Sequence, residues 1–95
     1  MSKLDEIRKE IDKVDERMLI LFEKRMKFIE EISKYKKKNN QEIFDEKREE
    51  ELLEKNIAKL KNKKLAKHYQ DMLKKTIEIS KKYQENIRWK NKKGE

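Results

Sequence analysis

The sequence predicts an all-α fold, and three observations support the prediction. The 95 residues include one glycine and no proline, so the usual residues of tight turns are scarce. Lysine, glutamate and leucine, which favour helices, are abundant along the chain. Apolar residues also recur at alternating spacings of four and three, which is the period of a helical seam. We therefore expect residues 1–95 to form a single helical domain.

The first helix is expected over residues 4–38 and should be unusually long. One slot of its apolar series holds Arg25, and the others hold Leu4, Ile7, Ile11, Val14, Met18, Leu21, Phe28, Ile32 and Tyr35. At 1.5 Å per residue the helix would reach about 50 Å. A compact domain of this size has a radius of gyration of only about 12–13 Å. Much of the helix must therefore project beyond its own chain, and a second copy is the simplest partner.

Composition supports a core that is shared between chains. Hydrophobic residues make up 34% of the sequence and charged residues 51%, which leaves little material for the core of a small domain. A homodimer would supply the missing apolar surface.

The remaining helices are delimited by polar stretches. The stretch 39–41, with two asparagines and a glutamine, should end the first helix, and Asp45 after Phe44 has the character of an N-cap. We expect the second helix over residues 45–60.

A lysine-rich turn over residues 61–64 should lead into a third helix over residues 65–88. The basic tail, residues 89–95, has no apolar period and is expected to be frayed.

Two cations of the first helix stand out. Arg25 replaces an apolar residue on the seam, and burying an unpaired guanidinium costs several kcal/mol. Lys36 lies eleven residues further on, about 1100° of rotation, and so projects within about 20° of Arg25. This pair favours an anionic ligand held inside a helical bundle.

The other two helices also place polar groups beside their apolar faces. Asp45, Arg48 and Glu49 precede the first apolar turn of the second helix, and Ser80 and Gln84 are four residues apart on the third. Each has an ordinary explanation by itself, such as a packed arginine stem or a serine bonded to its own helix. Their combination on three helices favours a ligand that carries carboxylates.

Composition also limits the classes of function. With no cysteine and a single histidine, His68, no metal site is expected. The N-terminus is charged where a signal peptide would be apolar, and no segment is apolar enough to span a membrane, so we expect a cytoplasmic protein. The net charge of +8 is compatible with nucleic acid, an acidic membrane or a small anion. The lysine runs are typical of solvated helix ends, and 7% aromatic residues argue against a base-stacking surface.

Three segments resemble the all-helical chorismate mutases. They are LDEIRKEIDKVDERMLILFEKRMKFIEEISKYK, FDEKREEELL and IEISKKYQ, and the resemblance covers about residues 4–87. It implies an intertwined homodimer of three-helix protomers with crossing first helices and two active sites. It also implies conversion of chorismate to prephenate in phenylalanine and tyrosine biosynthesis, by a concerted rearrangement that needs no cofactor.

The resemblance also implies a set of site residues. One chain would supply Arg25, Lys36, Asp45, Arg48, Glu49, Ser80 and Gln84, and the other would supply Arg8. Arg8 and Arg25 would bind the two carboxylates of chorismate, with Ser80 assisting. Lys36 and Gln84 would donate to the ether oxygen.

The acidic and basic residues of the second helix complete the implied site. Glu49 would hold the ring hydroxyl, and Asp45 and Arg48 would line the same side.

Two alternative functions stay open from the sequence. One is an isochorismate pyruvate lyase on the same fold, and the other is a basic helical module that binds nucleic acid or protein. The basic tail also leaves room for docking to another enzyme of the shikimate pathway.

Overall fold

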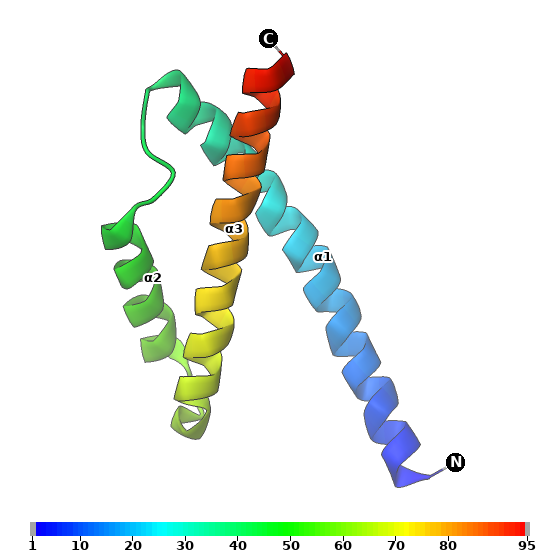
Figure 1. The fold of residues 1–95 in the computed structure, drawn as a ribbon. Helices are drawn as coiled ribbons and strands as arrows, with labels where there is room; N and C mark the ends of the chain where they lie inside the picture. The colour runs from blue at the N-terminus through cyan, green and yellow to red at the C-terminus, as the bar shows by residue number, and fades with distance from the viewer. Residues whose placement is uncertain (1, 95) are drawn as a thin grey trace.

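The computed structural model describes the backbone of residues 2–94 and the side chains of residues 2–88. Three α-helices and one short 3-10 helix make up this part of the chain, and no strand occurs in it. The elements are α1 (Lys3–Lys38), α2 (Glu46–Lys59), η1 (Lys63–Leu65) and α3 (Ala66–Gly94). The prediction of an all-α fold with a very long first helix is confirmed (Figure 1).

The three helices are organised around α3. This helix packs against both α1 and α2, whereas the backbones of α1 and α2 do not come close to each other over residues 2–94 (Figure 1). The buried apolar side chains of the described residues are Ile29, Leu73 and Ile77. Equally many buried residues are polar: Ser33, Ser80 and Gln84. The predicted shortage of core is therefore real, and half of what is buried is polar.

Local side-chain and backbone hydrogen bonds fix both ends of α1. Ser2 caps the first turn by accepting a hydrogen bond from the backbone N–H of Asp5 at 3.1 Å. At the other end Asn40 has a φ of 54°, a left-handed conformation that asparagine tolerates better than most residues. The N–H of Gln41 then reaches the carbonyl of Lys36 at 2.7 Å, as in a Schellman motif. The predicted break at residues 39–41 is confirmed.

The N-terminal half of α1 extends away from the rest of the chain (Figure 1). Every residue from 2 to 24 is exposed, including the apolar ones of the predicted seam. The molecule measures 57 × 29 × 15 Å and its radius of gyration is 17.2 Å, well above the 12–13 Å or so of a compact domain of this length. The prediction that the first helix reaches beyond its own chain is confirmed.

The second helix begins where its N-cap was predicted. Asp45 accepts a hydrogen bond from the backbone N–H of Arg48 at 3.0 Å, and α2 then runs over one residue less at each end than the predicted range 45–60.

The third helix differs from its prediction at the C-terminal end. It was expected to stop at residue 88, but its backbone continues to Gly94. Residues 89–93 contain neither glycine nor proline, and lysines are favourable near the negative end of a helix dipole, so the helix has no reason to stop earlier. The backbone of residues 89–94 is therefore helical rather than without regular structure, and Glu95 lies outside the described residues.

The described residues contain no candidate for a membrane span or a metal site. None of their helices combines the length and the apolar character that crossing a membrane requires. No cluster of three or more histidine, cysteine, aspartate or glutamate side chains suited to a metal ion occurs among them.

Candidate active site

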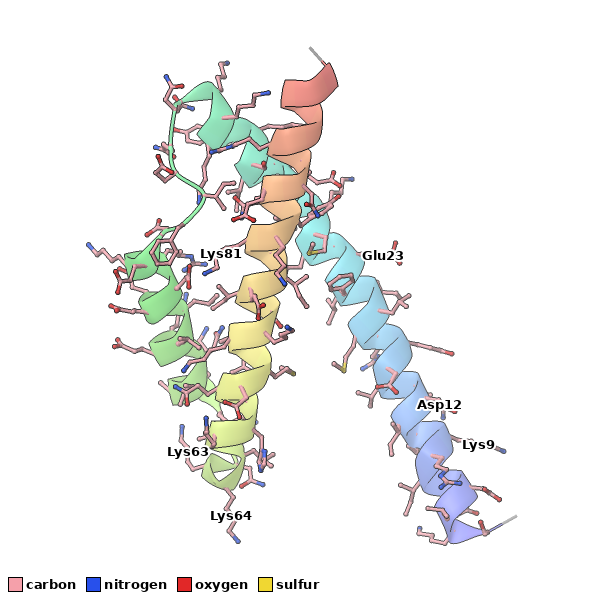
Figure 2. The ribbon with its side chains drawn as sticks, viewed as in Figure 1. Lys9, Asp12, Glu23, Lys63, Lys64 and Lys81 are labelled. Carbon is pink, nitrogen blue, oxygen red and sulfur yellow. The ribbon has the colours of Figure 1, made fainter. Side chains whose placement is uncertain are left out.

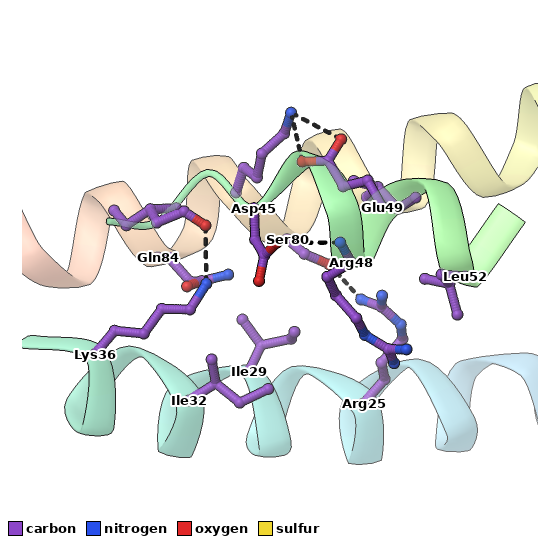
Figure 3. Close-up of a pocket in the computed structure, with 13 residues that line it drawn as sticks. Arg25, Ile29, Ile32, Lys36, Asp45, Arg48, Glu49, Leu52, Ser80 and Gln84 are labelled. Carbon is purple, nitrogen blue, oxygen red and sulfur yellow. Dashed lines mark hydrogen bonds and ion pairs between the residues drawn. The ribbon is translucent and has the colours of Figure 1, made fainter. Parts of the chain in front are cut away.

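A cavity of about 130 Å³ lies between α1 and α2, with α3 forming its floor (Figure 3). The helix α3 packs against both walls, and the loop of residues 39–45 joins them. Seven of the eight site residues predicted from the sequence line this cavity. They are Arg25, Lys36, Asp45, Arg48, Glu49, Ser80 and Gln84. Lys81 of α3 and five apolar side chains complete the lining, the latter being Ile29, Ile32, Ile43, Leu52 and Ile77.

Arg25 is oriented by Ser80. Its Nη1 atom donates a hydrogen bond to the Ser80 hydroxyl, which in turn donates to the carbonyl of Thr76 at 2.9 Å. Ser80 is only 4% exposed, so this chain of hydrogen bonds is held within the α1–α3 interface. The serine is bonded to its own helix, as an isolated helix serine would be, and it also fixes the direction of the guanidinium.

Arg25 also has an unfavourable electrostatic environment. Burial lowers the pKa of its guanidinium, and the positive charge of Arg48 on α2 lowers it further. Neither arginine forms an ion pair with a carboxylate among the described residues. An anion in the cavity would relieve both effects, because it would neutralise the two like charges at once.

Lys36 and Gln84 point into the opposite end of the cavity (Figure 3). The Lys36 ammonium donates to the carbonyl of Ile43 at 2.9 Å, which leaves it two further hydrogen atoms to donate. Gln84 is 5% exposed, and its Oε1 atom is buried without a hydrogen-bond partner among the described residues. A buried acceptor that stays without a hydrogen-bond partner lowers the stability of the fold by about 1–3 kcal/mol. This end of the cavity thus has unused capacity for hydrogen bonds.

The α2 wall carries the acidic groups. Asp45 faces the cavity next to its capping bond, and Glu49 forms an ion pair with Lys81 of α3 at 3.2 Å. Two carboxylates and four cations line the cavity, and the cations are Arg25, Lys36, Arg48 and Lys81. The cavity therefore carries two net positive charges, which suits a small molecule with two carboxylates.

Arg8 is the predicted site residue that the structure does not bring to the cavity. It lies on the projecting half of α1, where Figure 2 labels its neighbours Lys9 and Asp12, and its side chain is exposed. A role for Arg8 in this cavity would require a second chain, as the resemblance implied.

Lys81 lines the cavity but was not predicted from the sequence. It directly follows Ser80 and precedes Gln84 by three residues, so it lies on nearly the same face of α3. Lysines on helix surfaces are ordinarily solvated, and for this reason periodicity alone gave no signal. The carboxylate of Glu49 on a neighbouring helix is what draws it inward.

Comparison with known families agrees with this geometry. Residues 7–85 match the chorismate mutase type II family, and the chain therefore belongs to that family of all-helical proteins. Searches among curated proteins and among solved structures gave no match.

Proposed function

We propose that the protein is a chorismate mutase that converts chorismate to prephenate for the biosynthesis of phenylalanine and tyrosine. The observation that carries the proposal is the pair Arg25 and Arg48, two guanidinium groups in one cavity that form no ion pair with a carboxylate of the described residues, in a chain from this family. Chorismate is a dianion, so it would neutralise the two net positive charges of the lining. Membership of the family supports the activity in general.

The proposed reaction takes place within one molecule. A carbon–oxygen bond breaks while a carbon–carbon bond forms, so the protein supplies no nucleophile and no general base. Its tasks are to hold the flexible dianion in a chair-like conformation and to stabilise the negative charge that grows on the ether oxygen.

Arg25 suits the first task. Its planar guanidinium can bind a carboxylate at two points, and the hydrogen bond to Ser80 already fixes its direction. In the proposed homodimer the second carboxylate would be bound by Arg8 of the partner subunit.

Lys36 and Gln84 suit the second task. The ammonium keeps two hydrogens to donate beside its bond to Ile43, and the Gln84 amide is buried at the same end of the cavity. A missing donor of this kind typically costs about 10² to 10³ in rate. The proposal places Glu49 on the ring hydroxyl, which would donate to its carboxylate.

The homodimer is part of the proposal. Residues 2–24 are exposed although they include Leu4, Ile7, Ile11 and Val14, and apolar surface of this extent favours association. The cavity of one chain is also smaller than the roughly 300–1,000 Å³ of typical ligand sites. A second chain that adds Arg8 and further walls would enlarge the site.

Incubation of the purified protein with chorismate at neutral pH, in the presence of a chelator, tests the proposal. We expect the ultraviolet absorbance of chorismate to fall and prephenate to form, and we expect Arg25→Ala to abolish this while Lys24→Ala, an exposed neighbour, does not. Pyruvate released from isochorismate, without turnover of chorismate, would instead identify the lyase. Absence of both products would contradict an enzymatic role for the cavity.

A further inference from the structure

Lys81 connects two parts of the site that are otherwise independent. Its ammonium lies 3.2 Å from Oε2 and 3.4 Å from Oε1 of Glu49, so it contacts both oxygens of that carboxylate. The same ammonium lies 4.8 Å from the ring centroid of Phe44, within the range of a cation–π contact. One lysine of α3 thus holds both the first turn of α2 and the loop that precedes it.

The ion pair is more shielded than those that Lys13, Lys67, Lys75 and Lys82 form on the surface of their own helices. The side chains of Lys81 and Glu49 are 32% and 24% exposed, whereas those of Lys67 and Asp71 are 74% and 56% exposed. Exposed pairs contribute little, because water and salt screen them. The Lys81–Glu49 pair faces the cavity, so a ligand there would shield it further.

The two ends of the loop of residues 39–45 are held by the caps of α1 and α2, and its middle has few other attachments. Its backbone accepts hydrogen bonds from Lys36 at Ile43 and from Arg88 at Gln41, the latter at 3.2 Å. The Phe44 side chain is 57% exposed, so apolar burial does little to hold it. The contact with Lys81 is what ties this ring to α3.

We propose that Lys81 is a positioning residue of this site, which fixes the Glu49 carboxylate for a hydroxyl group of the bound molecule and holds the loop of residues 39–45 beside the cavity. This inference rests on the proposed function. An ionised carboxylate offers about four lone-pair directions, so Glu49 can accept from Lys81 and from a ligand hydroxyl at the same time. Lys81 acts through Glu49 and Phe44 and need not touch the reacting atoms.

The first consequence is kinetic. In Lys81→Met the carboxylate loses its anchor and the cavity loses one positive charge, so we expect kcat/KM to fall about tenfold, mainly through KM. Lys81→Arg keeps the charge and the reach, and should stay within about threefold of the wild type. Lys82→Met is the matched control, since Lys82 is exposed, pairs with Glu78 and lies outside the cavity lining.

A double-mutant cycle separates positioning from a direct role. If Lys81 acts through Glu49, then Lys81→Met should cost much less in a Glu49→Gln protein than in the wild type. An equal loss in both backgrounds would overturn the proposal, and so would kinetics of Lys81→Met that match those of Lys82→Met.

A second measurement does not depend on chorismate. Glu42 lies in the loop, so cleavage after Glu42 by a glutamyl endopeptidase, followed by mass spectrometry, reports on how firmly the loop is held. Cleavage should be faster in Lys81→Met than in Lys82→Met, and equal rates would overturn the contact with the loop. A wild-type protein that leaves chorismate unchanged would refute the proposed function and the kinetic role of Lys81. In that case the cleavage rates would still test the contact between Lys81 and the loop.

Discussion

Arg25 and Arg48 carry like charges on facing helices of one cavity, and Arg48 adds to burial in lowering the pKa of Arg25 (Figure 3). Two like charges on facing helices oppose folding, although Arg25 is only half-buried and Arg48 is exposed in the single chain. Here it persists beside a serine that fixes one of the two groups. The arrangement supports the proposal of an anionic ligand in this cavity.

Replacement of Arg25 should therefore separate activity from stability. We expect Arg25→Met to lower kcat/KM by at least about 10² to 10³, as loss of a key charged donor does. The free energy of unfolding without ligand should not fall, since the substitution removes a partly buried charge and its repulsion by Arg48. Urea unfolding and turnover of chorismate measure the two quantities, and Lys24→Met serves as control. A marked loss of stability would show that the guanidinium is structural.

Gln84→Glu should make kcat/KM depend on pH. The amide of Gln84 donates at any pH, whereas a glutamic acid donates only when it is protonated. We expect kcat/KM of this variant to rise as the pH falls below neutrality, by up to about tenfold per pH unit above the pKa of the new carboxyl group. Profiles for Gln84→Glu and for Gln70→Glu, which lies outside the cavity lining, provide the comparison. A wild-type profile in Gln84→Glu would remove the proposed role at the ether oxygen.

Subunit mixing tests the proposed role of Arg8. The homodimers of Arg8→Ala and of Arg25→Ala should both be nearly inactive. After denaturation and refolding of an equal mixture, about half of the dimers would be mixed, and each would contain one intact site of two. We therefore expect about a quarter of the wild-type activity. No recovery, with mixed dimers demonstrated by mass spectrometry, would mean that Arg8 does not act across an interface.

Val14→Glu should disrupt the proposed dimer. Val14 is 56% exposed in the single chain, and a carboxylate there would have to be buried in an interface formed by the projecting half of α1. We expect analytical ultracentrifugation to find monomers and the activity to be lost. Lys13→Glu is the control, because Lys13 is exposed and pairs with Glu10 of its own helix. A Val14→Glu protein that stays dimeric would place the interface elsewhere.

The hydrogen bond from Tyr83 to Glu30 should give the fold a dependence on alkaline pH. This bond joins α3 to α1. It is the largest cause of the raised pKa of Tyr83, ahead of burial and of the charge of Glu30, and the pKa lies above its ordinary value of 10.0. A raised pKa means that the stabilisation is complete below pH 10.0 and is lost as the pH rises through the value in the folded protein. Tyr83→Phe should thus be less stable than the wild type at neutral pH. Urea titrations should find that this difference shrinks at strongly alkaline pH, and an unchanged difference there would contradict the prediction.

Features set by neighbouring residues could be predicted from the sequence. The break after Lys38 and the N-cap Asp45 depend on backbone groups only a few positions away, and both were predicted correctly. The seven residues that line the cavity were found because they interrupt apolar faces or match the family pattern. Their roles remain proposals.

Features that depend on how helices cross could not be predicted in this way. Periodicity predicts a single apolar seam in α1 through Phe28 and Ile32, but both are exposed in the single chain. Ile29 and Ser33, one residue later in each case, are the side chains of α1 that are buried. The helix therefore has two faces, and periodicity does not tell which one meets α3. Lys81 was missed for the same reason, since its partner Glu49 lies 32 residues away.

The exposed half of α1 also bears on how the chain folds. A helix of about 20 residues is only marginally stable in water when no apolar face is covered, and residues 2–24 have no such cover from their own chain. Their helical structure would then be acquired together with association rather than before it. If the proposed homodimer forms in this way, its activity would depend on protein concentration, because dilution would separate the subunits and melt the first turns of α1.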